Sequence, residues 1–185
     1  MIDSVVKLTE KVSELLKYRA ERRTRKFKYL IEPTYVALKR VHQDYVSVFE
    51  SAKNELASDR TLRAIADSLE IRRRAEEAER RAILQQAETM VSNMSLVECH
   101  SFFSAIVDYF HQTPFSGGST PSNMLLHALR AAVNDEPVVL TTKPSGGRDP
   151  RDRLAEAIED ALSILRQNWE MVSIEYAKAL AASVE

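Results

Sequence analysis

Cysteine is nearly absent from this sequence, and neither sign of charge is in excess. Cys99 is the single cysteine among 185 residues, which excludes an intramolecular disulfide and a zinc site built from several thiolates. The 26 Lys and Arg residues balance the 27 Asp and Glu residues, so the net charge indicates neither nucleic acid nor membrane as a partner. From the cysteine content we predict a reducing, cytoplasmic location.

Long hydrophobic runs are also missing. No stretch approaches the roughly 18 uninterrupted apolar residues that a membrane span requires, and Asp3 stands where a secretory signal needs positive charge. We therefore expect neither export nor insertion into a membrane.

Glycine and proline are scarce, and they are confined to the second half of the sequence. All four glycines and five of the six prolines follow residue 110, which predicts loops at 113–120 and 135–149. Only Pro33 interrupts the first 110 residues, so long helices are expected there. Pro33 fits the first turn of a helix, or it kinks a longer helix that begins near Asp3, which is the reading we favour.

Two long stripes of apolar and aromatic residues recur at steps of three or four, the spacing of one helix face. The first consists of Ile31, Tyr35, Leu38, His42, Tyr45, Phe49, Ala52 and Leu56, and the second of Leu154, Ile158, Leu162, Leu165, Trp169, Val172, Tyr176 and Ala179. They predict two main rods at 34–57 and 150–183, with Phe49 and Trp169 inside the core. Residues 96–134 are expected to form a helical hairpin.

The predicted fold class is all-α, a bundle of about six helices that forms a single domain over residues 1–185. Residues 1–32 are expected to be a protruding basic helical arm. The two seams are longer than a small bundle obviously needs for its own core, which favours self-association in coiled-coil style.

Polar tips interrupt the first seam at Tyr35, His42 and Tyr45. A buried polar side chain on a packing seam needs a hydrogen-bond partner, and such residues set register in coiled coils. One interpretation is a hydrogen-bonded core or interface histidine. The other is a small ligand pocket or a pH switch, since histidine titrates near neutral pH.

Signatures of catalysis are not found in the sequence. It contains no P-loop, no dinucleotide-binding glycine motif, no H-E-x-x-H and no G-x-S-x-G elbow. The single Asp108-x-x-His111 pair does not build a metal site, and the neighbouring Cys99 and His100 point about 100° apart on a helix. We therefore expect no catalytic residue, metal, cofactor or small-molecule substrate.

Charge is concentrated in two segments. Residues 70–81 hold nine charged side chains of mixed sign, which favours a solvated helical stretch. Residues 17–28 hold seven basic residues and one acid, the basic ones being Lys17, Arg19, Arg22, Arg23, Arg25, Lys26 and Lys28. Arginine forks suit phosphate, so this segment is a candidate for sequence-independent binding to nucleic acid.

Three alternatives stand beside that interpretation of residues 17–28. The cations form a solvated face, or they dock on the acidic start of the last rod, which holds Asp149, Asp152, Glu156, Glu159 and Asp160. Binding to a membrane surface is disfavoured, because residues 1–16 contain more acids than bases and lack Trp and Phe.

These observations predict a non-enzymatic helical interaction or scaffold protein. Its expected partner is a second copy of itself or another helical protein. The alternative is a nucleic-acid-binding accessory protein that uses residues 17–28.

Overall fold

The computed structural model describes residues 21–58, 60–93, 99–111, 121–137, 140 and 149–184, without the side chains of residues 71–77. Within these ranges the regular structure is helical and no strand occurs, which confirms the predicted all-α class. The elements are η1 (Phe27–Ile31), α2 (Glu32–Leu56), α3 (Leu62–Val91), α4 (His100–His111), α5 (Pro121–Val133) and α6 (Pro150–Val184).

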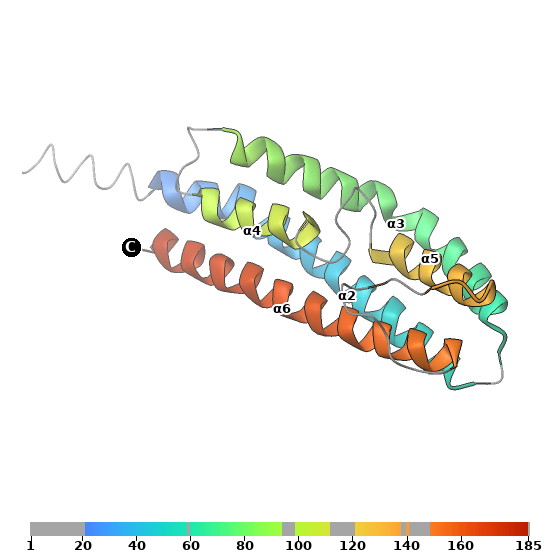
Figure 1. The fold of residues 1–185 in the computed structure, drawn as a ribbon. Helices are drawn as coiled ribbons and strands as arrows, with labels where there is room; N and C mark the ends of the chain where they lie inside the picture. Colours follow the sequence, from blue (N-terminus) through green and yellow to red (C-terminus); the bar gives the residue numbers. More distant parts are fainter. Residues whose placement is uncertain are drawn as a thin grey trace, which may run out of the picture.

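The helices form four antiparallel layers (Figure 1). Helix α2 leads away from the end where the C-terminus lies, α3 returns, α4 and α5 lead away again in succession, and α6 returns. Helix α2 packs on α3 and α6, while α4 and α5 both pack on α3 and α6. The arrangement is an up-down-up-down bundle whose third layer is broken into two helices.

The two predicted main rods are present as α2 and α6, with 25 and 35 residues. The predicted hairpin at 96–134 is wrong, because α4 and α5 lie one after the other along α3 (Figure 1). Each of them buries its apolar face, with Phe103 in α4 and Leu125 in α5 fully covered. Because α3 is long and α4 and α5 are short, two helices placed end to end are needed to cover its apolar face. This favours the tandem arrangement over pairing of α4 with α5.

Two of the helices begin with a proline. These are α5 at Pro121 and α6 at Pro150, and the fixed φ of proline suits the first turn. The Asp149 carboxylate accepts a hydrogen bond of 2.8 Å from the Arg151 backbone N–H, as an N-cap residue does. Most of the predicted loops at 113–120 and 135–149 lies outside the described residues, whereas residues 134–135 form a turn after α5.

The helix continues through Pro33 instead of beginning there. Residues 21–26 are helical and run into η1, a π-helical turn in which the Glu32 N–H bonds to the Phe27 carbonyl. Proline supplies no N–H to the turn before it. The Thr34 hydroxyl donates a hydrogen bond of 2.6 Å to the Leu30 carbonyl, which satisfies one acceptor there. The longer helix favoured by the sequence is therefore present from residue 21.

Arg151 fastens the far end of the bundle. Its guanidinium donates hydrogen bonds to the carbonyls of Leu56 and Ser58, each at 2.9 Å, and to the carbonyl of Arg60. The last carbonyls of a helix lack partners within the helix. One side chain from α6 thus caps the end of α2 and fixes the turn that leads to α3.

The core lies along the seams that the sequence predicts. Phe49 is completely buried, as expected, whereas Trp169 is only partly buried. The indole sits at the edge of the core because it covers the rings of Tyr35 and His42 from outside. The position predicted for Phe49 is confirmed and that of Trp169 is corrected to the rim.

Phe49→Ala is expected to lower the free energy of unfolding by about 3–5 kcal/mol, because it leaves a cavity in a closed core. Trp169→Ala is expected to cost less, about 2 kcal/mol, because solvent can enter the vacated space at the rim. Urea unfolding of the two variants and the parent measures both values. A larger loss for Trp169→Ala than for Phe49→Ala contradicts this assignment of core and rim.

Candidate functional site

His42 is the centre of a buried polar cluster that joins three helices. Its Nδ1 lies 3.0 Å from the Tyr109 hydroxyl on α4. Its ring stacks on Trp169 of α6, with centroids 4.7 Å apart and planes 10° from parallel. One side chain of α2 therefore holds α4 through a hydrogen bond and α6 through a stacked ring.

Burial keeps this cluster neutral. Removal from water, together with the positive charge of Arg166, lowers the pKa of His42 to about 4. Burial also raises the pKa of Tyr109 well above its usual value. A neutral imidazole and a neutral phenol form an ordinary hydrogen bond, which supports the interpretation of His42 as a core residue with a structural partner.

The three predicted polar tips do not meet in one pocket. Tyr35 stacks on Tyr176 with a centroid separation of 3.8 Å, and its hydroxyl lies 3.4 Å from the Ser173 hydroxyl. It shares Trp169 with His42, so these two residues belong to one aromatic row between α2 and α6. Tyr45 faces Arg80 of α3, whose guanidinium carbon is 4.1 Å from the centre of its ring.

Arg80 is the site residue that the sequence analysis missed. It is 2 % exposed, and its Nη1 donates a hydrogen bond of 2.8 Å to the Ser122 hydroxyl of α5. The expectation that residues 70–81 form a wholly solvated stretch is therefore wrong at Arg80. The planar guanidinium is accommodated because it stacks on an aromatic face while its Nη1 donates a hydrogen bond.

A periodic signal for Arg80 exists in the sequence. The buried residues Ile83 and Ala87 follow it at three and seven positions, so the buried stripe of α3 extends back onto Arg80. Its charge concealed this position within a stretch of nine charged residues. Glu70, at the start of the same stretch, lies 2.6 Å from Arg130 on α5.

The basic segment lies at the end of the bundle where α6 terminates. Arg22, Arg23, Arg25 and Lys28 are exposed and Lys26 is partly buried, while Lys17 and Arg19 lie outside the described residues. The Thr24 hydroxyl donates a hydrogen bond of 3.0 Å to the Ser183 carbonyl near the C-terminus.

The alternative in which this segment docks on the acidic start of the last rod is wrong for residues 21–28. The start of α6 lies at the opposite end of the bundle (Figure 1). There Lys53 of α2 pairs with Glu159, and this contact lowers the pKa of the Glu159 carboxyl. The acidic start of α6 is thus paired with a lysine near the C-terminal end of α2.

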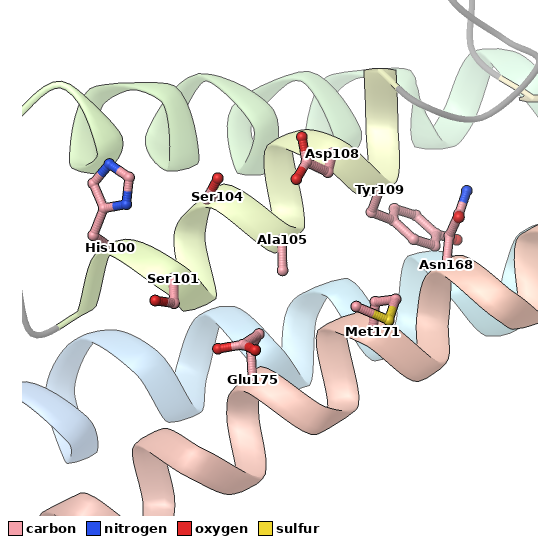
Figure 2. Close-up of a pocket in the computed structure, with 9 residues that line it drawn as sticks. All are labelled: His100, Ser101, Ser104, Ala105, Asp108, Tyr109, Asn168, Met171 and Glu175. Atoms are coloured by element: carbon pink, nitrogen blue, oxygen red, sulfur yellow. The ribbon is translucent and has the colours of Figure 1, made fainter.

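A polar groove runs between α4 and α6, with a volume of about 340 Å³ (Figure 2). Its walls carry two acids, an imidazole and three small polar side chains, from His100, Ser101, Ser104, Asp108, Asn168 and Glu175. The Asn168 amide nitrogen is buried there without a hydrogen-bond partner. The groove can therefore form hydrogen bonds to a small polar molecule.

The groove residues are not arranged for nucleophilic catalysis. Figure 2 shows the His100 ring and the Asp108 carboxylate on separate turns of α4, and Cys99 is buried in the core, 3 % exposed. His111 pairs with Glu88 instead of Asp108, because its ring lies 3.2 Å from the Glu88 carboxylate on α3. Among the described residues no group of three His, Cys, Asp or Glu side chains could hold a metal ion.

Comparison with protein-family models, curated proteins and solved structures found no match for this chain. In the part of the chain that the structure describes, no helix combines the length and apolar character needed to cross a membrane.

The lowered pKa of His42 predicts a loss of stability in acid. The unfolded chain binds a proton at His42 below about pH 6.5, whereas the folded chain does so only near a pKa of about 4. The contribution of His42 to the free energy of unfolding is therefore fully present above about pH 6.5. It is lost between about pH 6.5 and 4, and the loss is at most about 3 kcal/mol. Urea unfolding at several pH values measures this slope.

His42→Gln is the control for that measurement, because Gln retains a hydrogen-bonding side chain but does not titrate. The variant is expected to be less stable than the parent at pH 7 and to show a shallower loss between pH 6.5 and 4. Parallel curves for the parent and the variant would exclude His42 as the source of the acid sensitivity.

Proposed function

We propose that this protein is a non-enzymatic helical interaction protein that binds a second copy of itself through the C-terminal third of α6. The supporting observation is that burial along α6 stops before the helix does. Val172 is its last buried residue, and all the following positions to Val184 are exposed or partly buried. Tyr176 and Ala179 still pack against the core from the inner side of these turns. Helices gain most of their stability from packing of an apolar face, so the exposed outer side of the same turns offers a face to a partner.

Large apolar side chains gather on this part of α6. Met171 is 57 % exposed, Ile174 41 %, Leu180 42 % and Val184 82 %. Scattered exposed apolar residues are normal in proteins, whereas contiguous ones mark interaction surfaces. Of these four residues, Ile174 and Val184 lie on the same side of the helix, and this side favours an interface.

The spacing of the exposed residues favours a second helix of the same kind. Ile174, Ala177, Ala181 and Val184, here called the terminal face, are all exposed and follow one another at three, four and three positions. This is the repeat of a coiled-coil seam, and small residues let two helices approach closely. A single face of this type pairs with its own copy about a two-fold axis.

The two long seams do not supply this interface. They pack against each other within one chain, as the contacts of Trp169 with Tyr35 and His42 illustrate. Self-association is thus proposed through the terminal face in place of the seams at 31–56 and 154–179.

Ile174→Glu combined with Ala181→Glu is expected to convert a dimer into a monomer, because like charges then face each other across the two-fold axis. Light scattering should give at least twice the chain mass of 21.0 kDa for the parent and the single chain mass for the variant.

Val133→Glu is the matched control, since Val133 is 40 % exposed on α5, outside the terminal face. It should leave the dimer mass unchanged. A parent mass of 21.0 kDa at every concentration, or equal dissociation by the control, would overturn the proposal.

Binding of nucleic acid is the second candidate, and the exposure of Arg22, Arg25 and Lys28 favours it. Residues 21–28 lie at the end of the bundle remote from the acidic start of α6 (Figure 1). Exposed guanidinium and ammonium groups contact phosphates without reading base sequence. The expected activity is weak, salt-sensitive binding to the backbone of DNA or RNA.

Replacing Arg22, Arg25 and Lys28 with Gln should weaken binding to duplex DNA at about 50 mM salt and make log affinity less dependent on log salt by roughly 2.7, if each cation contacts one phosphate. Fluorescence anisotropy of a labelled duplex measures both quantities. Replacing the exposed Lys39, Arg40 and Arg63 with Gln removes equal charge elsewhere and should have little effect. No binding by the parent at that salt concentration excludes this candidate.

A further inference from the structure

A pocket of about 370 Å³ opens at the end of the bundle, between residues 23–31, Cys99 and the last turns of α6. We call it the end pocket. It is lined by Arg23, Lys26, Phe27, Ile31, Cys99, Ala179, Ala182 and Ser183. Small-molecule sites have volumes of this order and combine apolar walls with a few polar groups.

The floor of the end pocket is apolar and well packed. Phe27 is 8 % exposed, Ile31 3 % and Cys99 3 %. None of these side chains carries a strong hydrogen-bonding group, so the floor has nothing with which to hold ordered water firmly. The part of a ligand that reaches it must be aliphatic or aromatic.

The π-helical turn shapes this floor. Phe27 and Ile31 are the first and last residues of η1, and both side chains face the pocket. A π turn inserts one extra residue into a helix at a cost in stability, and such turns occur frequently at functional sites. The π turn is seen in the backbone hydrogen bonding and not from the cavity. It therefore supports the pocket as a site independently.

The rim of the pocket is cationic. Arg23 and Lys26 are three residues apart in the same helix, a separation that places both side chains on one face. A guanidinium fork and an ammonium group together suit a carboxylate, which accepts hydrogen bonds on two oxygens. The positive charge of the rim thus suits a ligand with a negative head.

We propose that the end pocket binds a single-chain fatty carboxylate, with its tail against Phe27, Ile31 and Cys99 and its carboxylate between Arg23 and Lys26. This site goes beyond the proposed self-association. Ala179 and Ser183 point into the bundle, whereas Ile174 and Ala181 of the terminal face point outward. The two surfaces therefore lie on opposite sides of α6.

Calorimetric titration of the full chain with octanoate and decanoate tests the proposal. Two added methylenes should strengthen binding about 15-fold if they are buried. Acetate, which has the head but no tail, should give no binding heat, and decanol, which lacks the charge, should bind more weakly than decanoate. No heat with decanoate, or equal affinity for octanoate and decanoate, would overturn the proposal.

Arg23→Gln combined with Lys26→Gln should weaken decanoate binding about tenfold, because two partly solvated charge contacts are lost, and should leave decanol binding unchanged. Arg22→Gln combined with Arg25→Gln removes the same charge from the same helix outside the pocket and should leave decanoate binding within about twofold. Equal weakening by both pairs would indicate attraction to the general charge of the segment and would overturn the assigned site.

Cys99 locates the ligand, because it is the single cysteine of the chain and lines the pocket. Saturating decanoate should slow its reaction with a thiol reagent, while acetate should not. Ala182→Trp fills the pocket from its exposed rim and should abolish decanoate binding with helicity unchanged by circular dichroism. Unchanged thiol reactivity, or undiminished binding by a folded Ala182→Trp variant, would show that decanoate binds elsewhere.

Discussion

The packing of α2 on α6 depends on one stacked row of rings. Trp169 stacks on Tyr35 and on His42, at centroid separations of 5.2 and 4.7 Å, and Tyr35 stacks in turn on Tyr176. Flat rings held face to face do not slide by a helical turn without losing all their contacts. Since His42 also bonds to Tyr109, the same row fixes the register of α4, and three of the four layers are set by one cluster.

The position of this row explains why the two ends of the bundle differ. Toward the far end α6 continues with a closed core, and Arg151 ties it to the turn between α2 and α3. Toward the near end the row finishes at Tyr176, which contacts Phe27 at a centroid separation of 5.6 Å. Beyond it the helices remain in contact, as through Thr24 and Ser183, but they no longer enclose a core. The end pocket and the exposed residues Leu180 and Val184 of α6 lie beyond that end of the aromatic row.

Periodicity predicted the rods because core positions repeat along a helix regardless of what the helix packs against. The buried residues Phe49 and Leu165 follow that repeat. The order of packing was not readable, since α4 and α5 have similar apolar faces and nothing local distinguishes a hairpin from two helices in line. Of the polar residues, His42 was recognised because it interrupts an apolar seam. Arg80 was missed because its partners, Tyr45 and Ser122, belong to other helices, and a charge on a seam is ordinarily assigned to solvent.

The last turns of α6 present two faces, and their physical coupling follows from linkage. The proposed ligand in the end pocket would contact Ala179 and Ser183 and would restrain the last turns of α6. The proposed partner on the terminal face would contact Ile174 and Ala181 and would restrain the same turns from the other side. Each event would then lower the conformational entropy that the other must remove, and by linkage each would strengthen the other by an equal factor. This reciprocity requires no movement of the far end, where Arg151 holds the helices in one arrangement.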